Sequence, residues 1–143
     1  ALGTAPVGGW LAVSGRWDSW APIVLGLAVG LWVAGFDTIY SLQDQDFDRE
    51  KGLFSFPARF GERTALRTAA GLHVLAWVFL GVFGQMAAFG WRYQTTWIAV
   101  GAVLAGETVW AQKEEDRQRA FFHANAAVSL LVLGGVMWEI FGR

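Results

Sequence analysis

The stretch Trp20–Leu42, WAPIVLGLAVGLWVAGFDTIYSL, decides the fold of this chain. Asp37 is its one charged residue, and as a helix the stretch is long enough to cross the hydrocarbon core of a bilayer. A carboxylate inside such a span is costly, so it marks a functional site more often than it serves the fold. The stretch therefore predicts a transmembrane helix that carries a site near its C-terminal end.

The composition around this stretch is that of a polytopic helical membrane protein. Of the 143 residues, 55% are hydrophobic and 16% are charged, whereas a soluble domain carries about 25% charged residues. The mean hydropathy is +0.37, and the apolar residues come in long blocks without the regular polar face of a surface helix. The net charge of -1 implies no nucleic-acid partner, and the absence of cysteine excludes disulfides and thiol catalysis.

An all-α transmembrane bundle with about four full spans and one truncated span is predicted. The full spans cover residues 20 to about 42, 68 to about 89, 95 to about 111 and 121 to 141, while residues 1–13 are too short to span. Because the chain begins within an apolar segment and without Met, we expect residues 1–143 to be a single transmembrane domain fragment of a longer polypeptide. Gly52, Pro57 and Gly61 break regular helix, so we expect a loop before a new helix that starts near Glu62. Residues 90–94 are expected to form a short turn.

The basic residues predict how the bundle is oriented. Eight of the eleven lysines and arginines fall in two connections that the span count places on one side of the membrane. By the positive-inside rule this side faces the cytosol, and tryptophans at the opposite ends agree with it. We expect a protein of the bacterial inner (cytoplasmic) membrane with its acid-rich loop facing the cytosol. The eight residues are Arg49, Lys51, Arg59, Arg63, Arg67, Lys113, Arg117 and Arg119.

Three acids and a phenol recur at helical spacing where the first span ends. Asp37, Tyr40, Asp44 and Asp48 fall within roughly 60° of one another if the helix continues at about 100° per residue. Several carboxylate oxygens on one face suit Mg²⁺ held against a phosphorylated substrate. Asp46 lies on the opposite face and is expected to be solvated.

The stretch Asp37–Gly61, DTIYSLQDQDFDREKGLFSFPARFG, resembles the second aspartate-rich motif of the UbiA family of intramembrane prenyltransferases. The match covers the pattern D-x-x-Y-x-x-x-D-x-x-x-D and continues through the loop behind it. The flanking spans look like the C-terminal half of the nine-helix bundle of that family, so the resemblance extends over essentially the whole chain. The matching residues are Asp37, Tyr40, Asp44, Asp48, Arg49, Gly52, Ser55, Pro57, Arg59, Phe60 and Gly61.

The resemblance implies transfer of a polyprenyl group from its diphosphate to a small aromatic acid in quinone biosynthesis. In such enzymes Mg²⁺ bridges the diphosphate to two aspartate-rich motifs, and here it would be held by Asp44 and Asp48. Asp37 would orient the acceptor or take up a proton, and Tyr40 would line the cavity or hydrogen-bond the diphosphate. The implied substrate-binding residues are Arg49, Lys51, Ser55, Arg59 and Asn125, of which Asn125 equally fits a hydrogen bond between helices.

Two departures from the family pattern matter. The first motif, N-D-x-x-D-x-x-x-D, is absent from this sequence, so we expect the missing N-terminal half of the polypeptide to supply half of the metal ligands. The 143 residues alone are therefore expected to be inactive. Phe54 stands where a lysine often precedes the loop serine, so the cation is expected from Lys51, Arg49 or Arg59.

Two alternatives remain open at this point. The acceptor is expected to be 4-hydroxybenzoate, and a dihydroxynaphthoate, as in menaquinone-type enzymes, is the alternative. A different class of function is an ion-coupled transporter that uses Asp37. A transporter predicts acids along a path through several spans, whereas here they cluster at one helix end beside a basic loop.

The remaining polar residues of the spans are assigned no catalytic role. Glu107 is expected to be solvated at the membrane interface rather than to face the cavity. His73 and His123 are too far apart in sequence, with no ligands nearby, to predict a zinc site. The 18 glycines are interpreted as points of close helix packing.

Overall fold

Every regular element that the computed structural model describes is a helix, in agreement with the predicted class. The structure describes residues 1–113 and 117–142, without the side chains of residues 117–121. A 3₁₀ turn (Leu2–Thr4) and α1 (Ala5–Ser14) precede α2 (Ala21–Tyr40), which continues through a second 3₁₀ turn (Ser41–Asp44) into α3 (Gln45–Lys51). The remaining helices are α4 (Phe56–Phe60), α5 (Glu62–Met86), α6 (Trp91–Trp110) and α7 (Arg117–Phe141).

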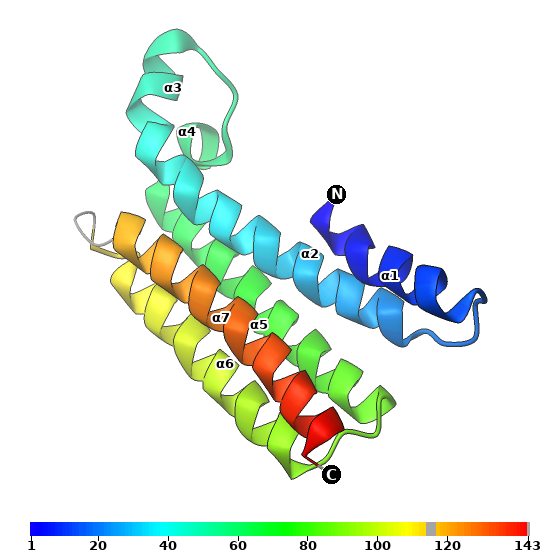
Figure 1. Cartoon of the computed structure of the whole chain (residues 1–143). Helices are drawn as coiled ribbons and strands as arrows, with labels where there is room; N and C mark the ends of the chain where they lie inside the picture. Colours follow the sequence, from blue (N-terminus) through cyan, green and yellow to red (C-terminus); the bar gives the residue numbers. More distant parts are fainter. Residues whose placement is uncertain (114–116, 143) are drawn as a thin grey trace.

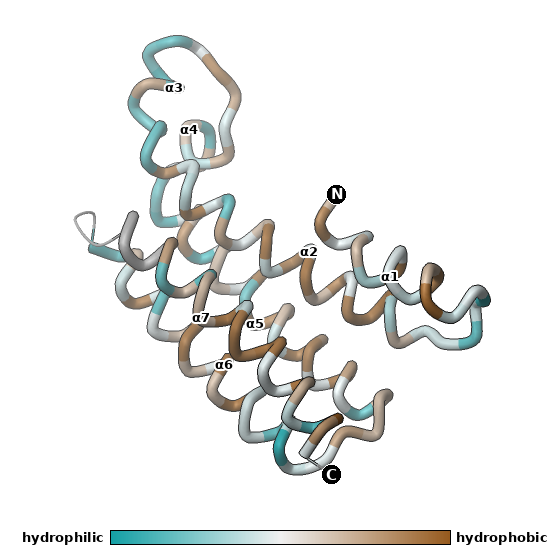
Figure 2. Tube along the Cα trace, viewed as in Figure 1, coloured by the Kyte–Doolittle hydropathy of each residue, from teal (hydrophilic) through white to brown (hydrophobic). Residues whose placement is uncertain are grey.

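The long helices α2, α5, α6 and α7 lie side by side, each antiparallel to the previous one in the chain (Figure 1). The most extensive contacts join α2 to α5 and α6 to α7, and smaller contacts between α5 and α6 and between α2 and α7 close the ring. Ala28, Leu80, Leu104 and Val128, one from each helix, are buried together at its centre. Figure 2 shows apolar colour along these helices and hydrophilic colour at the end that carries α3.

Three of the helical segments in the described residues are long and apolar enough to cross a membrane. They cover residues 21–51, 62–86 and 122–141. α6, expected as the third of the four full spans, has a similar length, but polar residues such as Arg92, Gln94 and Glu107 leave it outside this set. The chain is thus a helical membrane bundle in which α6, of the four long helices described, is the one outside the set of apolar spans.

Local sequence explains where the short helices end. Gly52 follows α3 in the left-handed conformation, with φ +64°, which glycine adopts without strain. The Ser55 hydroxyl accepts a hydrogen bond from the backbone N–H of Ala58 at 3.4 Å and caps α4. Gly61, with φ +82°, separates α4 from α5, and α5 begins at Glu62 as predicted.

One predicted boundary is wrong. Residues 91–94, expected as a turn, form the first turn of α6. The reason is a contact that is distant in sequence, because the buried Glu139 carboxylate of α7 accepts a hydrogen bond from the backbone N–H of Tyr93 at 3.4 Å. A carboxylate at this position satisfies an N–H group that the helix itself cannot pair.

A reciprocal pair of tryptophans joins α5 to α6. The indole N–H of Trp77 donates to the carbonyl of Trp97 at 2.9 Å, and the indole N–H of Trp97 donates to the carbonyl of Trp77 at 2.8 Å. The two rings are stacked 4.2 Å apart with 4° between their planes. Each ring lies over a glycine of the other helix, because a Cβ at Gly101 would be 2.7 Å from Trp77 and a Cβ at Gly81 would be 3.1 Å from Trp97.

We expect Trp77→Phe to lower the free energy of unfolding by about 1 kcal/mol, since it keeps an aromatic ring but removes one hydrogen bond between membrane helices. Trp97→Phe should have the same effect, because the two bonds are equivalent. The matched control is Trp110→Phe, at an exposed position near the end of α6. Unfolding of the protein in mixed micelles measures the difference, and equal losses for all three variants would contradict the prediction.

Candidate functional site

The acidic end of α2 is built from three consecutive helical pieces. Asp37 and Tyr40 lie in the last turn of α2, Asp44 ends the second 3₁₀ turn, and Asp48 lies in α3. A 3₁₀ turn advances about 120° per residue instead of about 100°. The uninterrupted α-helix on which the single-face alignment depended is therefore not present. Helical spacing relates Asp37 to Tyr40, and Asp44 to Asp48, as two separate pairs.

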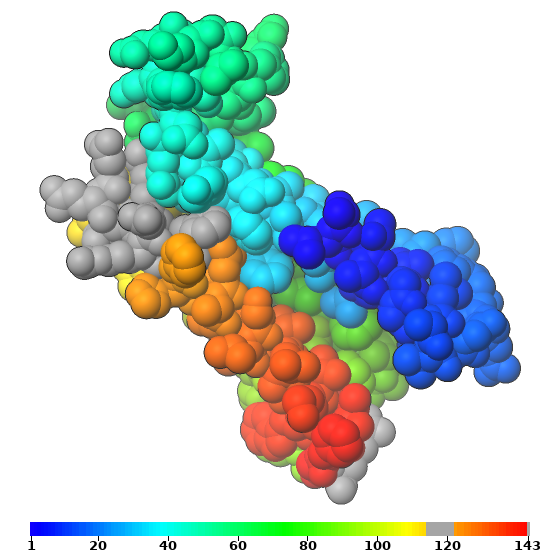
Figure 3. Space-filling model, turned by 45° about the horizontal axis from the view of Figure 1, so that its top comes forward, coloured from blue at the N-terminus to red at the C-terminus, as the bar shows by residue number. Residues whose placement is uncertain are grey.

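The side chains of Asp37, Tyr40 and Asp44 are exposed, and that of Asp48 is half-buried. Among the described residues, the carboxylates of Asp44 and Asp48 have no hydrogen-bonding or ion-pairing partner. They lie about one helical turn apart at the base of the segment formed by α3 and α4, which stands out from the end of the bundle (Figure 3). Two carboxylates that no cation neutralises are thus available at this end of α2.

The oxygens of this acidic pair fit part of a magnesium site. Mg²⁺ is commonly bound by one or two carboxylates, with waters and substrate phosphates as its other ligands. No cluster of three or more acidic, histidine or cysteine side chains able to hold a metal occurs in residues 1–113 and 117–142. Asp44 and Asp48 therefore suit an ion whose other ligands come from outside the described residues. Asp46 is exposed, as expected.

Arg49 and Ser55, both expected to bind substrate, brace the α3–α4 segment. The Nε of Arg49 donates to the carbonyl of Ala58 at 3.2 Å. With the Gln45 amide turned so that its oxygen faces Arg49, that oxygen accepts hydrogen bonds of 2.8 and 3.3 Å from the terminal guanidinium nitrogens. Ser55 holds the start of α4, so both side chains already have partners that shape the segment.

Two other cations of this segment have no carboxylate partner among the described residues. Lys51 lies 5.9 Å from the centre of the Phe47 ring. The Arg59 guanidinium lies 5.4 Å from the ring of Phe54 and 5.7 Å from that of Phe60. Both side chains are exposed, so their charge is available to an anion that binds near the acidic pair.

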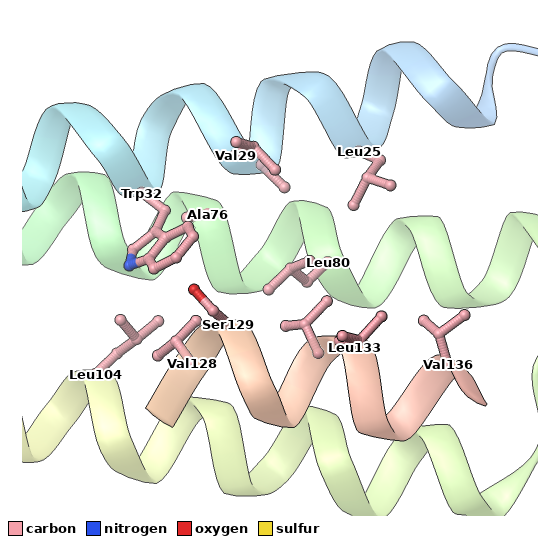
Figure 4. A pocket seen from close by; sticks show the side chains of 12 residues that line it. Leu25, Val29, Trp32, Ala76, Leu80, Leu104, Val128, Ser129, Leu133 and Val136 are labelled. Carbon is pink, nitrogen blue, oxygen red and sulfur yellow. The ribbon is translucent and has the colours of Figure 1, made fainter. Parts of the chain in front are cut away.

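An apolar cavity of about 280 Å³ lies between α2, α5 and α7, deeper in the bundle (Figure 4). Its walls are mainly aliphatic, and Trp32 and Ser129 add an indole and a hydroxyl. Asn125, one turn before Ser129 on α7, is half-buried, and its Oδ1 has no hydrogen-bond partner among the described residues. An apolar cavity with few polar groups suits a hydrocarbon chain.

A buried pair of titratable side chains lies between α5 and α6. His73 Nδ1 is 3.6 Å from Glu107 Oε2, and the two side chains are 2% and 0% exposed. The expectation that Glu107 is solvated is therefore wrong. A sequence signal existed, because Glu107 follows the buried Leu104 by three residues and the buried Val100 by seven, on one helix face. His73 fits beneath Gly35 of α2, where a Cβ would overlap the imidazole ring.

Known proteins resemble the chain over most of its length. The model of the UbiA prenyltransferase family matches residues 1–126. The chain is 29% identical to a 4-hydroxybenzoate octaprenyltransferase of Saccharophagus degradans, covering 80% of this chain and 38% of that protein. It is 29% identical to a protein of the same name in Pseudomonas putida, covering 96% of this chain and 42% of that protein. It is 33% identical to one in Klebsiella pneumoniae, covering 78% of this chain and 39% of that protein. The chain thus spans about two fifths of the length of these relatives, and no solved structure shows a significant match.

Proposed function

The chain belongs to the UbiA prenyltransferase family, and on that premise we propose that it forms part of an enzyme that transfers a polyprenyl group from its diphosphate to 4-hydroxybenzoate. The activity is that of the whole protein, since relatives with this name are more than twice as long. The observation that carries the proposal is the pair Asp44 and Asp48, which no cation of the described residues neutralises, at the end of an apolar span. The exposed cations Lys51 and Arg59 lie in the α3–α4 segment that follows. An anionic diphosphate joined to a hydrocarbon chain needs this combination.

Different residues of the chain would have different roles in the proposed reaction. Mg²⁺, when bound by Asp44 and Asp48, supplies positive charge that stabilises the departing diphosphate. Lys51 and Arg59 would contact the diphosphate oxygens, while Arg49 keeps the segment in shape. Asp37, in the last turn of α2, would orient the acceptor or take up the proton that the aromatic ring releases.

The apolar cavity would take part of the polyprenyl chain. Aliphatic walls exclude water, which would otherwise capture the allylic cation left when the diphosphate departs. The face of the Trp32 ring is the one aromatic surface there that can stabilise a cation. Tyr40 and Asn125 would line the space between this cavity and the acidic pair, Tyr40 at the end of α2 and Asn125 on α7.

The proposed orientation places the acidic pair on the cytosolic side of a bacterial inner membrane. The α3–α4 segment, the C-terminal end of α6 and the N-terminal end of α7 lie at the same end of the bundle (Figure 1). Eight of the eleven basic residues fall in residues 49–67 and 113–119, in or directly after the connections that join α2 to α5 and α6 to α7, and basic residues favour the cytoplasmic side. Part of the second connection, residues 114–116, and the side chains of Arg117 and Arg119 lie outside the described residues.

The substrate assignment is tested with the whole protein in micelles, a polyprenyl diphosphate and Mg²⁺. We expect prenylated 4-hydroxybenzoate to form at least tenfold faster than prenylated dihydroxynaphthoate, and chelation of Mg²⁺ to stop the reaction. Faster reaction of the dihydroxynaphthoate would assign the enzyme to the menaquinone type. Ion flux into proteoliposomes without any prenylated product would contradict the proposal and favour the transporter.

A further inference from the structure

A groove runs between α5 and α6, away from the segment after α2 that carries Asp44 and Asp48. Its apolar part has a volume of about 570 Å³ and ends at Trp77. Its mouth, of about 270 Å³, is lined by Arg63, Arg67 and Gln112. Ala70 and Thr108 line both parts, so the mouth and the apolar part are continuous.

The mouth of the groove carries positive charge that no acidic side chain of the described residues neutralises. Arg63 and Arg67 are one helical turn apart near the start of α5, and both are exposed. Neither has an ion-pair or hydrogen-bond partner among the described residues. Two guanidinium groups one turn apart, with the Gln112 amide beside them, offer several N–H donors to a phosphate group.

The apolar part has the depth of one bilayer leaflet. On α6 the apolar part extends from Ile98 to Thr108, a rise of about 15 Å at 1.5 Å per residue, which is half of the roughly 30 Å hydrocarbon core. Ala102 and Ala105 on α6 are too small to fill the groove, and the exposed Val74 forms part of the α5 side. Trp77 and Ile98 lie at its deep end.

We propose that this groove binds an anionic phospholipid, with its phosphate at Arg63 and Arg67 and one acyl chain along Val74, Ala102 and Ala105. The charge at the mouth selects an anionic headgroup, because basic pockets between transmembrane helices attract such groups. The apolar part requires a ligand with a hydrocarbon chain, which inorganic phosphate lacks. The site is separate from the proposed reaction and does not depend on it.

Lipid binding to the delipidated whole protein, followed by native mass spectrometry, tests the site. We expect phosphatidylglycerol to bind more tightly than phosphatidylcholine with the same chains. The double substitution Arg63→Gln and Arg67→Gln should weaken phosphatidylglycerol binding about thirtyfold. Ala105→Phe, which fills the groove, should also weaken the binding of phosphatidylglycerol.

The matched controls are Arg92→Gln, near the start of α6, and Ala126→Phe, at an exposed position of α7. Both control variants should bind phosphatidylglycerol like the wild type.

Two outcomes would overturn the proposal. In the first, the double arginine variant binds phosphatidylglycerol like the wild type, as it would if Glu114, Glu115 and Asp116 neutralised the arginines or other segments of the whole protein covered the groove. In the second, inorganic phosphate at millimolar concentration displaces the lipid headgroup and Ala105→Phe has no effect. The mouth would then be a site for free phosphate and not for a lipid.

Discussion

We expect Asp44→Asn and Asp48→Asn each to lower kcat of the whole enzyme by about a hundredfold or more, the range found when one charge-stabilising group is removed. Asparagine keeps the size of the side chain but has no negative charge with which to hold Mg²⁺. The double variant should also lose Mg²⁺-dependent binding of polyprenyl diphosphate. Steady-state kinetics and equilibrium binding, each with and without the metal, measure the two effects.

Asp46→Asn is the matched control for these variants. Asp46 lies between the two acids in sequence and is exposed. Because we assign it no role in the reaction, kcat of the Asp46→Asn variant should stay within about threefold of the wild type. If Asp46→Asn lowered kcat as much as the other two, general negative charge at the end of α2 would explain the results better than a specific pair. Full activity of the double variant would contradict the assignment of Asp44 and Asp48.

The second large effect is expected from Gly35→Leu, at the contact between α2 and α5. A Cβ at this position would overlap the imidazole ring of His73 and lie 3.3 Å from the carbonyl of Ala69. His73 is buried against Glu107, and the Ala69 carbonyl belongs to the backbone of α5, so it cannot turn away from an added side chain. Overpacking of this kind costs about 3 kcal/mol, and it would separate the helices just before the acidic end of α2. We therefore expect lower stability together with lower activity.

Gly71→Leu provides the matched control for this substitution. Gly71 lies on α5, is exposed, and a Cβ there would meet no atom within 4 Å. The control should be neutral or slightly stabilising, because leucine has a higher helix propensity than glycine. Unfolding in mixed micelles compares the two variants. Equal stability of Gly35→Leu and Gly71→Leu would show that α2 and α5 do not pack as described.

The features that the sequence predicted correctly depend on neighbouring residues. Long apolar blocks predicted the helical bundle, and Gly61 predicted the helix start at Glu62. The features that it missed depend on contacts between distant residues. The first turn of α6 is capped by Glu139, 46 residues away, and the buried Glu107 has His73 of α5 as its neighbour. No local pattern encodes either partner.

For the candidate site, the sequence predicted that the acidic residues lie in helix, but it did not predict the type of helix. Asp37 to Asp48 do form one continuous helical segment, but the 3₁₀ turn at Ser41–Asp44 changes the register between the two pairs. Spacing alone assumes one helix type throughout, so it could not reveal this change. The bracing role of Arg49 also required the structure, since its acceptor Ala58 lies beyond a loop. The roles of Asp44 and Asp48 remain predictions from the family resemblance and from their freedom from other partners.

The most direct measurement is a structure of the whole protein with Mn²⁺ in place of Mg²⁺ and an unreactive polyprenyl thiodiphosphate, in which anomalous scattering locates the metal. We expect a metal ion about 2.1 Å from carboxylate oxygens of Asp44 and Asp48, bound on its other side to the diphosphate. A metal ion bound elsewhere, with Asp44 and Asp48 turned away from the diphosphate, would contradict this expectation.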